Sequence, residues 1–145
     1  MTRINSAIPV TNLTDEHLLA EHREIKRLPY CLQKAISSGS INNIPNKFCL
    51  GKGHVLFFLN KMKFIYERYR QLHNECLVRG FSIADYSSNF DYISQQYNND
   101  YSPTLHESSL LILRINDRIN NGKCKYYHYY GNRITKEFAC KLLTQ

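Results

Sequence analysis

The spacing of hydrophobic residues along the chain predicts a long first helix that begins after residue 14. Its apolar side chains recur at intervals of seven, seven and four, which places them on one helical face: Leu18, Ile25, Leu32 and Ile36. Thr14 can cap the N-terminus, where Asp15 and Glu16 suit the positive end of the helix dipole. Pro29 interrupts the stripe, but because the stripe continues beyond it we expect a kink rather than an end. The Ser-Ser-Gly-Ser segment 37–40 should terminate this helix.

The second predicted helix is the clearest element of the sequence. Its apolar face consists of Met62, Ile65, Tyr66, Tyr69, Leu72, Cys76 and Leu77. Its polar face, expected to point away from the core, consists of Glu67, Arg68, Arg70, Gln71 and Glu75. Arg79 and Gly80 provide a C-terminal cation and a left-handed stop, with Phe81 available for the hydrophobic contact that often follows.

A third helix is predicted from its capping residues. Thr104 and Glu107 have the spacing of a capping box, and Pro103 lies just before them. The helix should run to about Asn121, because Gly122 then stops it.

The remaining segments contain no confident strand. Apolar residues 55–59 must be buried, whereas residues 82–103 are polar and tyrosine-rich and indicate a long irregular connection. Residues 1–13 are expected to form an irregular N-terminal arm. We therefore predict an all-α fold, a compact three-helix single domain that spans residues 1–145.

The charge of the chain indicates a polyanionic partner. Lysine and arginine number 19 against 12 acidic residues, a formal net charge of +7, and nucleic acid is the partner that best fits this excess. An acidic lipid surface would need a basic amphipathic helix with an exposed apolar face, and none is evident. No segment is apolar enough to span a membrane or to act as a secretory signal, so we expect an intracellular, cytoplasmic protein of a phage or a bacterial host.

The cysteines and histidines indicate neither disulfides nor a metal site. The five cysteines form no CxxC pair and are odd in number, which fits a reducing compartment. His17 and His22 lie about 140° apart on a helical wheel, and no third ligand is near them. We expect no metal and no cofactor.

The first helix also carries the most suggestive charged residues. Arg23 and Arg27 should lie on its exposed side, with Glu24 on the flank between that side and the core. The three residues form either a solvated face with an i,i+3 ion pair or a phosphate-binding face beside a general acid or base. Glu21 projects near the apolar face, so we expect it in a buried structural ion pair.

Two further segments are compatible with nucleic-acid binding. Residues 51–54, Gly-Lys-Gly-His, either bring backbone amides near a phosphate or simply form a turn. Residues 123–133 combine basic side chains with Tyr126, Tyr127, Tyr129 and Tyr130. These tyrosines either stack on bases or pack in the core, and one pair could do each.

Short motifs spread over nearly the whole chain form one collinear pattern. They are, in order, Thr2-Arg3-Ile4-Asn5, His17-Leu18, Ala20-Glu21-His22-Arg23-Glu24 with Arg27, Gly53-His54-Val55, Phe57-Phe58, Lys61, Glu75-Cys76-Leu77, Arg79-Gly80-Phe81, Asp100-Tyr101, His106-Glu107 and Tyr129-Tyr130-Gly131. The pattern resembles the endonuclease V family of T-even bacteriophages. The members of that family are pyrimidine-dimer DNA glycosylases with apurinic/apyrimidinic lyase activity.

This resemblance implies roles for particular residues. Thr2 matches the family's nucleophile, the α-amine that is freed when the initiator methionine is removed, and Glu24 matches its catalytic glutamate. Arg3, Arg23 and Arg27 match residues that grip the phosphates around the lesion. The implied DNA-binding set comprises Arg3, His17, Arg23, Arg27, Tyr127, Tyr129 and Tyr130. The implied partner is double-stranded DNA with UV-induced lesions, bound by a monomer.

The sequence departs from the family pattern at a few positions. Glu16 stands where the family has glutamine, Tyr126 where it has tryptophan and His128 where it has lysine, and the tail after Gly131 is longer. Two alternatives to dimer excision remain open. One is a related glycosylase and lyase for another damaged or modified base, and the other is a non-catalytic basic DNA-binding protein.

Overall fold

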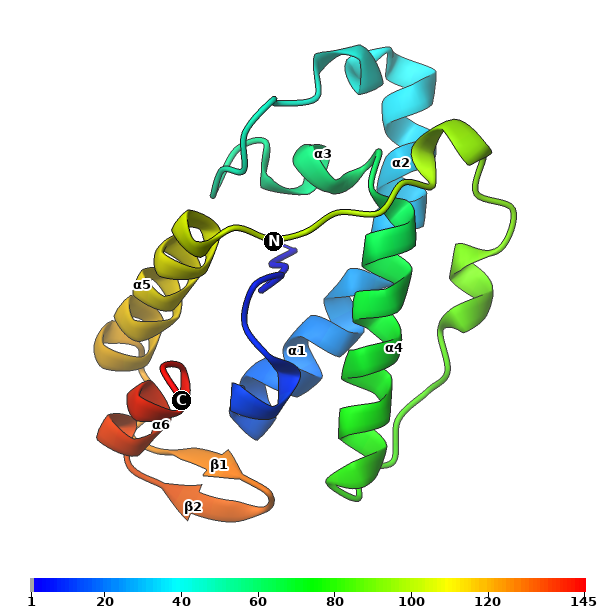
Figure 1. The fold of residues 1–145 in the computed structure, drawn as a ribbon. Coiled ribbons are helices and arrows are strands. Elements are labelled where there is room, and N and C mark those ends of the chain that lie inside the picture. Colours follow the sequence, from blue (N-terminus) through cyan, green and yellow to red (C-terminus); the bar gives the residue numbers. More distant parts are fainter. Residues whose placement is uncertain (1) are drawn as a thin grey trace.

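The computed structural model describes residues 2–145, which form a cluster of helices with one short β-hairpin (Figure 1). The helices are α1 (Asp15–Ile25), α2 (Leu28–Ser38), α3 (His54–Phe58), α4 (Met62–Val78), α5 (Leu105–Asn121) and α6 (Lys136–Leu142). The antiparallel hairpin pairs β1 (Tyr127–Tyr129) with β2 (Asn132–Ile134). The predicted all-α architecture is confirmed, and α3, α6 and the hairpin come in addition to the predicted helices.

The elements surround the N-terminal arm. Helix α1 packs along α4, β1 contacts α1, and α6 packs on α5. The arm runs between α1 and α5 (Figure 1). Ile4, Ile8 and Leu13 of the arm are fully or almost fully buried, so this irregular segment is part of the hydrophobic core.

The predicted kink at Pro29 is wrong, because the chain forms two separate helices there. Helix α1 ends at Ile25 and α2 begins at Leu28, with residues 26–27 in a turn between them. Proline has no N–H to donate, and its ring would clash with the carbonyl four residues earlier inside a continuous helix. In the first turn of α2 neither problem arises, because the first N–H groups of a helix have no intrahelical acceptor.

Helix α4 ends as the sequence predicts, but its polar face differs from the prediction. Gly80 adopts a φ of +85°, and the Phe81 N–H donates to the Cys76 carbonyl at 3.0 Å. Arg68 and Glu75, expected to point away from the core, are instead only 4% and 7% exposed. Arg68 meets the carboxylate of Glu21 on α1. Glu75 pairs with Arg79, four residues further along the chain, and accepts a hydrogen bond from the Tyr130 hydroxyl.

Helix α5 begins at the predicted cap, although the capping box is only half formed. The Glu107 N–H donates to the Thr104 hydroxyl at 3.1 Å. The Glu107 side chain does not return to the cap, since its carboxylate accepts hydrogen bonds from the hydroxyls of Ser6 and Tyr101. A carboxylate with no exposed surface therefore joins the arm to α5.

The long connection 82–103 is irregular, as predicted, apart from two short 3-10 helices. These are η3 (Ser87–Phe90) and η4 (Gln95–Tyr97); two others, η1 (Val10–Asn12) and η2 (Ser40–Asn43), lie earlier in the chain. Phe90 attaches the connection to the core, where its ring lies 5.3 Å from that of Tyr69. Among residues 2–145, no helix has the length and apolar character needed to cross a membrane.

A buried ion pair at the centre of the fold confirms the expectation for Glu21. Arg68 donates to Glu21 through Nε at 2.8 Å and through Nη2 at 3.0 Å, and the two side chains are 3% and 1% exposed. The Nη1 group of Arg68 donates to the Ile8 carbonyl at 2.6 Å. The pair therefore joins α1, α4 and the arm, and every oxygen of the carboxylate has a partner.

Replacing Arg68 with methionine should lower the free energy of unfolding by about 3–5 kcal/mol, because Glu21 would remain as an uncompensated buried charge. The matched control is Arg70→Met on the same helix. Arg70 and Glu67 are 58% and 60% exposed and 4.0 Å apart, so this change should cost no more than about 0.5 kcal/mol. Urea unfolding of both variants measures the difference, and equal effects would contradict a structural role for the buried pair.

Candidate functional site

The beginning of the arm is fixed beside the carboxylate of Glu24. The backbone N–H of Arg3 donates to Oε1 of Glu24 at 3.1 Å, across 21 residues of sequence. Glu24 lies in the last turn of α1, on the partly buried flank that the wheel predicts. One residue spans at most about 3.6 Å of chain, so the nitrogen of Thr2 lies within roughly 7 Å of this carboxylate oxygen.

A histidine holds the next residue of the arm. The Ile4 N–H donates to Nε2 of His54 at 3.0 Å, and the other ring nitrogen, Nδ1, donates to the Cys49 carbonyl at 2.9 Å. Only a neutral imidazole can accept at one nitrogen and donate at the other. Burial, with the nearby Arg114 charge, lowers the pKa of His54 to about 4, so the ring is neutral near pH 7. The 51–54 segment thus provides a side-chain anchor for the arm.

Asn5 connects the arm to two helices at once. Its amide donates to Oε1 of Glu21 at 3.0 Å, and its carbonyl oxygen accepts from Nη2 of Arg114 at 3.0 Å. Together with the bond from Ser6 to Glu107, each residue from 3 to 6 makes a hydrogen bond to another element of the fold.

A cleft of about 280 Å³ opens where the arm passes between α1 and α5. Its charged lining residues are Arg3, Arg23, Arg114, Arg118, Glu16, Glu21 and Glu24. A wider groove of about 690 Å³ adjoins it, shares Arg3, Arg114 and Arg118, and extends to Gly51 and Lys123. The four arginines face a space open to solvent, which is suited to a phosphate-bearing ligand.

His17 and Tyr127 form one wall of the cleft. Their rings stack with centroids 5.4 Å apart and planes inclined by 22°. Nδ1 of His17 lies 2.8 Å from the Thr14 hydroxyl, which also caps α1. Burial lowers the pKa of His17 to about 4, so this wall presents a neutral imidazole. Both predicted residues therefore line the cleft, although Tyr127 is only 4% exposed.

The other predicted DNA-binding residues are divided between the cleft and its surroundings. Arg3 and Arg23 line it. Arg27 is exposed in the turn before α2 and is not among the lining residues, although its backbone N–H donates to the Glu24 carbonyl at 3.0 Å. Contact of Arg27 with DNA remains a prediction.

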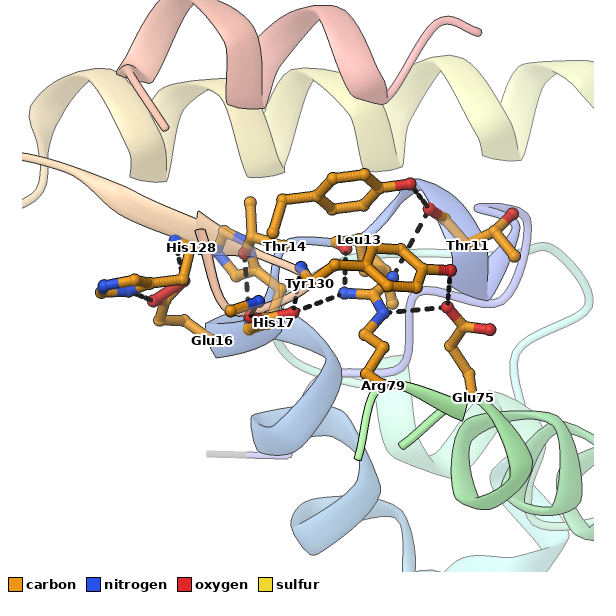
Figure 2. A network of polar contacts seen from close by, with 12 residues as sticks. Thr11, Leu13, Thr14, Glu16, His17, Glu75, Arg79, His128 and Tyr130 are labelled. Carbon is orange, nitrogen blue, oxygen red and sulfur yellow. Dashed lines mark hydrogen bonds and ion pairs between the residues drawn. The ribbon is translucent and has the colours of Figure 1, made fainter. Parts of the chain in front are cut away.

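Tyr129 and Tyr130 belong to a separate network centred on Arg79. The Tyr129 hydroxyl donates to the Thr11 carbonyl at 2.7 Å, and that of Tyr130 donates to Glu75 at 2.7 Å. The Arg79 guanidinium lies 4.9 Å and 4.5 Å from the two ring centroids. Figure 2 shows Arg79 between Glu75 and the end of the arm. Both hydroxyls are used within the fold, and DNA contact by these rings also remains a prediction.

Sequence reasoning did not single out Arg114 and Arg118. They lie four residues apart on α5 and so share a helical face, which is the one signal that could have drawn attention to them. Burial, with the charge of Arg3, lowers the pKa of Arg114 to about 10, which leaves it charged at pH 7. Its Nε atom is buried without a hydrogen-bond partner.

The chemistry available in the cleft is that of carboxylates and arginines. Within residues 2–145 no cluster of three or more His, Cys, Asp or Glu side chains is placed to bind a metal ion. His22 is turned toward His73, with its Nε2 3.1 Å from the Nδ1 of that residue. The site residues can bind an anion and transfer a proton close to the first residues of the chain.

The neutral state of His54 predicts a loss of stability in mild acid. The ring titrates near 6.5 when unfolded and near 4 when folded, so the unfolded chain binds more protons between these values. The free energy of unfolding should therefore fall as the pH drops from 6.5 to 4, with His54 contributing on the order of 3 kcal/mol. In His54→Gln the amide can still accept the Ile4 N–H, and urea unfolding should show a shallower pH dependence. His106→Gln, at an exposed histidine, should keep the original slope; the same slope in both variants would exclude His54 as the titrating group.

Comparison with known families gives these residues a context. The sequence model of a protein family described as pyrimidine dimer DNA glycosylase matches residues 1–88 of the chain. The matched span covers the arm and helices α1 to α4, and it includes Thr2, Glu24 and His54. Arg114 and Tyr127 lie beyond it.

Proposed function

The chain belongs to the pyrimidine dimer DNA glycosylase family, and from this premise we propose that it excises cyclobutane pyrimidine dimers from duplex DNA and then cuts the strand as a lyase. One observation carries the proposal. The Arg3 N–H donates to Glu24 at 3.1 Å, which holds the start of the chain against a carboxylate in an arginine-lined cleft.

We assign the nucleophile to the α-amine of Thr2, freed by removal of Met1. An α-amine has a pKa of about 8 and a lysine one of about 10.4, so at neutral pH the α-amine is roughly a few hundred times more often unprotonated. It can therefore attack the sugar without burial in an apolar pocket. The amine nitrogen bonds to C1′, and the base leaves with the electrons of the glycosidic bond. One amine proton passes to the departing base. The C1′–O4′ bond then breaks, O4′ takes a proton from water, and the nitrogen lone pair forms the C=N bond of a protonated imine.

Glu24 is assigned two roles in this sequence. Its negative charge stabilises the cationic imine, and its carboxylate accepts the C2′ proton that the imine makes acidic. The electrons of that C–H bond form a carbon–carbon double bond and expel the oxygen at C3′, which breaks the strand on the 3′ side of the site. The proposal is supported by the hydrogen bond from the Arg3 N–H, which holds this carboxylate next to the residue that follows the proposed nucleophile.

The arginines are assigned to the DNA backbone. Arg3 and Arg23 were predicted for this role, and Arg114 and Arg118 line the same cleft from the opposite helix. Guanidinium groups bind phosphates through paired hydrogen bonds, and such contacts orient the duplex without reading its sequence.

A second candidate function has the same glycosylase and lyase chemistry but acts on another damaged or modified base. Glu16, a departure from the family pattern, places a carboxylate in the lining of the cleft. A relative that removes another damaged or modified base would have the same nucleophile and the same glutamate, but different contacts around the lesion.

Borohydride should trap the imine. With a duplex that carries one cyclobutane dimer, or one bare abasic site, we expect a covalent adduct on Thr2, identified by mass spectrometry of the N-terminal peptide. Blocking the α-amine by acetylation should abolish both the adduct and strand cleavage, because the nucleophile is lost. Undiminished cleavage by blocked protein would disprove the mechanism.

The same substrates distinguish the alternative functions. Cleavage of the abasic duplex alone would favour the second candidate, the glycosylase for another base. Equal affinity for damaged and intact duplex, with no adduct, would indicate a non-catalytic DNA-binding protein.

Glu24→Gln should lower the rate of strand cleavage by about 10²- to 10⁴-fold while leaving DNA affinity nearly unchanged. Glutamine can still accept the Arg3 N–H, so the arm should stay in place and only the charge and proton transfer are removed. Glu67→Gln, at a carboxylate that is mostly exposed on α4, is the matched control and should keep the original rate. Single-turnover nicking and fluorescence anisotropy separate the two effects, and a full-rate Glu24→Gln enzyme would remove this residue from the mechanism.

A further inference from the structure

Glu16 and His128 form a contact at the edge of the cleft that the proposed chemistry does not use. Oε1 of Glu16 accepts the backbone N–H of His128 at 2.7 Å, and Oε2 lies 2.8 Å from Nδ1 of the same residue (Figure 2). The Glu16 and His128 side chains are 37% and 41% exposed, so the pair meets solvent. A single carboxylate thus holds both the main chain and the ring of one residue.

This contact adjoins the stacked pair that forms the cleft wall. Glu16 precedes His17 on α1, and Tyr127 precedes His128 on β1. Two consecutive residues of the helix therefore hold two consecutive residues of the strand, by a ring stack inside the cleft and by hydrogen bonds at its edge. The position of the Tyr127 wall relative to α1, which also carries Glu24, depends on both contacts.

Glu16 differs from the other carboxylates of the cleft in its partner. Glu21 faces the permanent charge of Arg68, and Glu24 accepts a backbone N–H of the arm. The partner of Glu16 is a histidine, whose imidazole is charged only when both ring nitrogens hold a proton. The pair therefore has a net charge of −1 when His128 is neutral and of zero when it is protonated.

Among residues 2–145, Glu16 is the one acid bound to the His128 ring. Across the hairpin His128 is paired with Arg133, whose guanidinium lies 3.8 Å from the ring centroid of Tyr126, and the Tyr126 ring is 5.6 Å from that of His128. On α1 the neighbouring Asp15 is occupied by the hairpin turn and by Arg79. From α5, Arg118 lines the same cleft as Glu16. The charge of the Glu16–His128 pair is thus controlled by the proton on His128.

We propose that Glu16 and His128 form a proton-controlled clasp at the edge of the DNA-binding cleft. Its hydrogen bonds keep β1 against α1, so Glu16 is a positioning residue for the Tyr127 wall. Proton uptake by His128 removes the net negative charge that incoming phosphates would meet, so DNA binds more tightly in mild acid. The inference rests on the proposed binding of duplex DNA.

The effect of the His128 charge on DNA binding is tested by measuring the affinity of the protein for DNA at constant ionic strength between pH 8 and pH 5.5. The probe is a duplex with a reduced abasic-site analogue, which the protein cannot cleave. His128→Gln should bind as the unmodified protein does at pH 8 but about fivefold more weakly at pH 5.5, since it cannot gain the proton. His128→Lys, permanently charged, should bind about fivefold more tightly at pH 8 and equally at pH 5.5. His106→Gln, an exposed histidine at the start of α5, is the matched control and should follow the unmodified protein throughout.

The positioning role is tested at Glu16 itself. Glu16→Gln can still accept the His128 N–H, so β1 should stay in place and DNA should bind more tightly at pH 8. Glu16→Ala also loses the negative charge and, in addition, both hydrogen bonds to His128. Asp15 still binds the hairpin turn, but Tyr127 is placed less exactly, so the cleavage rate should fall by about tenfold or more.

The possible outcomes distinguish this inference from the function on which it rests. Equal cleavage rates for Glu16→Ala and Glu16→Gln would overturn the clasp. An unchanged pH response in both His128 variants would overturn the proton control. If the unmodified protein bound no DNA at any pH, the proposed function would fail first, and the inference with it.

Discussion

The structure depends on how the buried polar groups of the N-terminal arm find partners. An irregular segment that passes through a core exposes backbone N–H and C=O groups to an apolar environment, and each one without a partner is costly. Here residues 3 to 6 are paired with Glu24, His54, Glu21 and Glu107, which come from three different helices. The first residues of the chain are therefore held by the whole fold, so their distance from Glu24 is a property of the helix packing.

Helix α1 contacts and orients the arm, α4 and the hairpin, because its carboxylates point in different directions. Asp15 binds the hairpin turn and Arg79, and Glu16 binds the strand β1. Glu21 binds Arg68 of α4, and Glu24 binds the arm. A carboxylate accepts several hydrogen bonds at once, which lets one short helix orient elements that are distant in sequence. The same helix thereby places a structural ion pair and the proposed proton acceptor three residues apart.

The arginines of the protein fall into two groups with different consequences. Arg68 and Arg79 are enclosed by acids and carbonyl oxygens, and they stabilise the contacts of α4 with the arm and with α1. Arg3, Arg23 and Arg118 line an open cleft, where their charge is available to a ligand. The formal net charge of +7 does not separate these groups, because it counts a neutralised arginine and an available one alike.

Much of the helical framework could be predicted from local patterns. Helix α4 and its stop at Gly80, and the cap of α5 at Thr104, rest on interactions within a few residues, which the sequence records directly. The collinear motifs likewise led to the family and to Thr2 and Glu24.

Only the tertiary structure decided which polar residues are buried. Arg68 and Glu75 lie at positions that a helical wheel assigns to solvent, and their partners, Glu21 and Tyr130, are 47 and 55 residues away. Hydrophobic periodicity reports where apolar side chains meet, but it contains no information about which distant charges come together. For the same reason the sequence placed Glu24 on the correct flank of its helix, while its contact with the start of the chain required the packed fold.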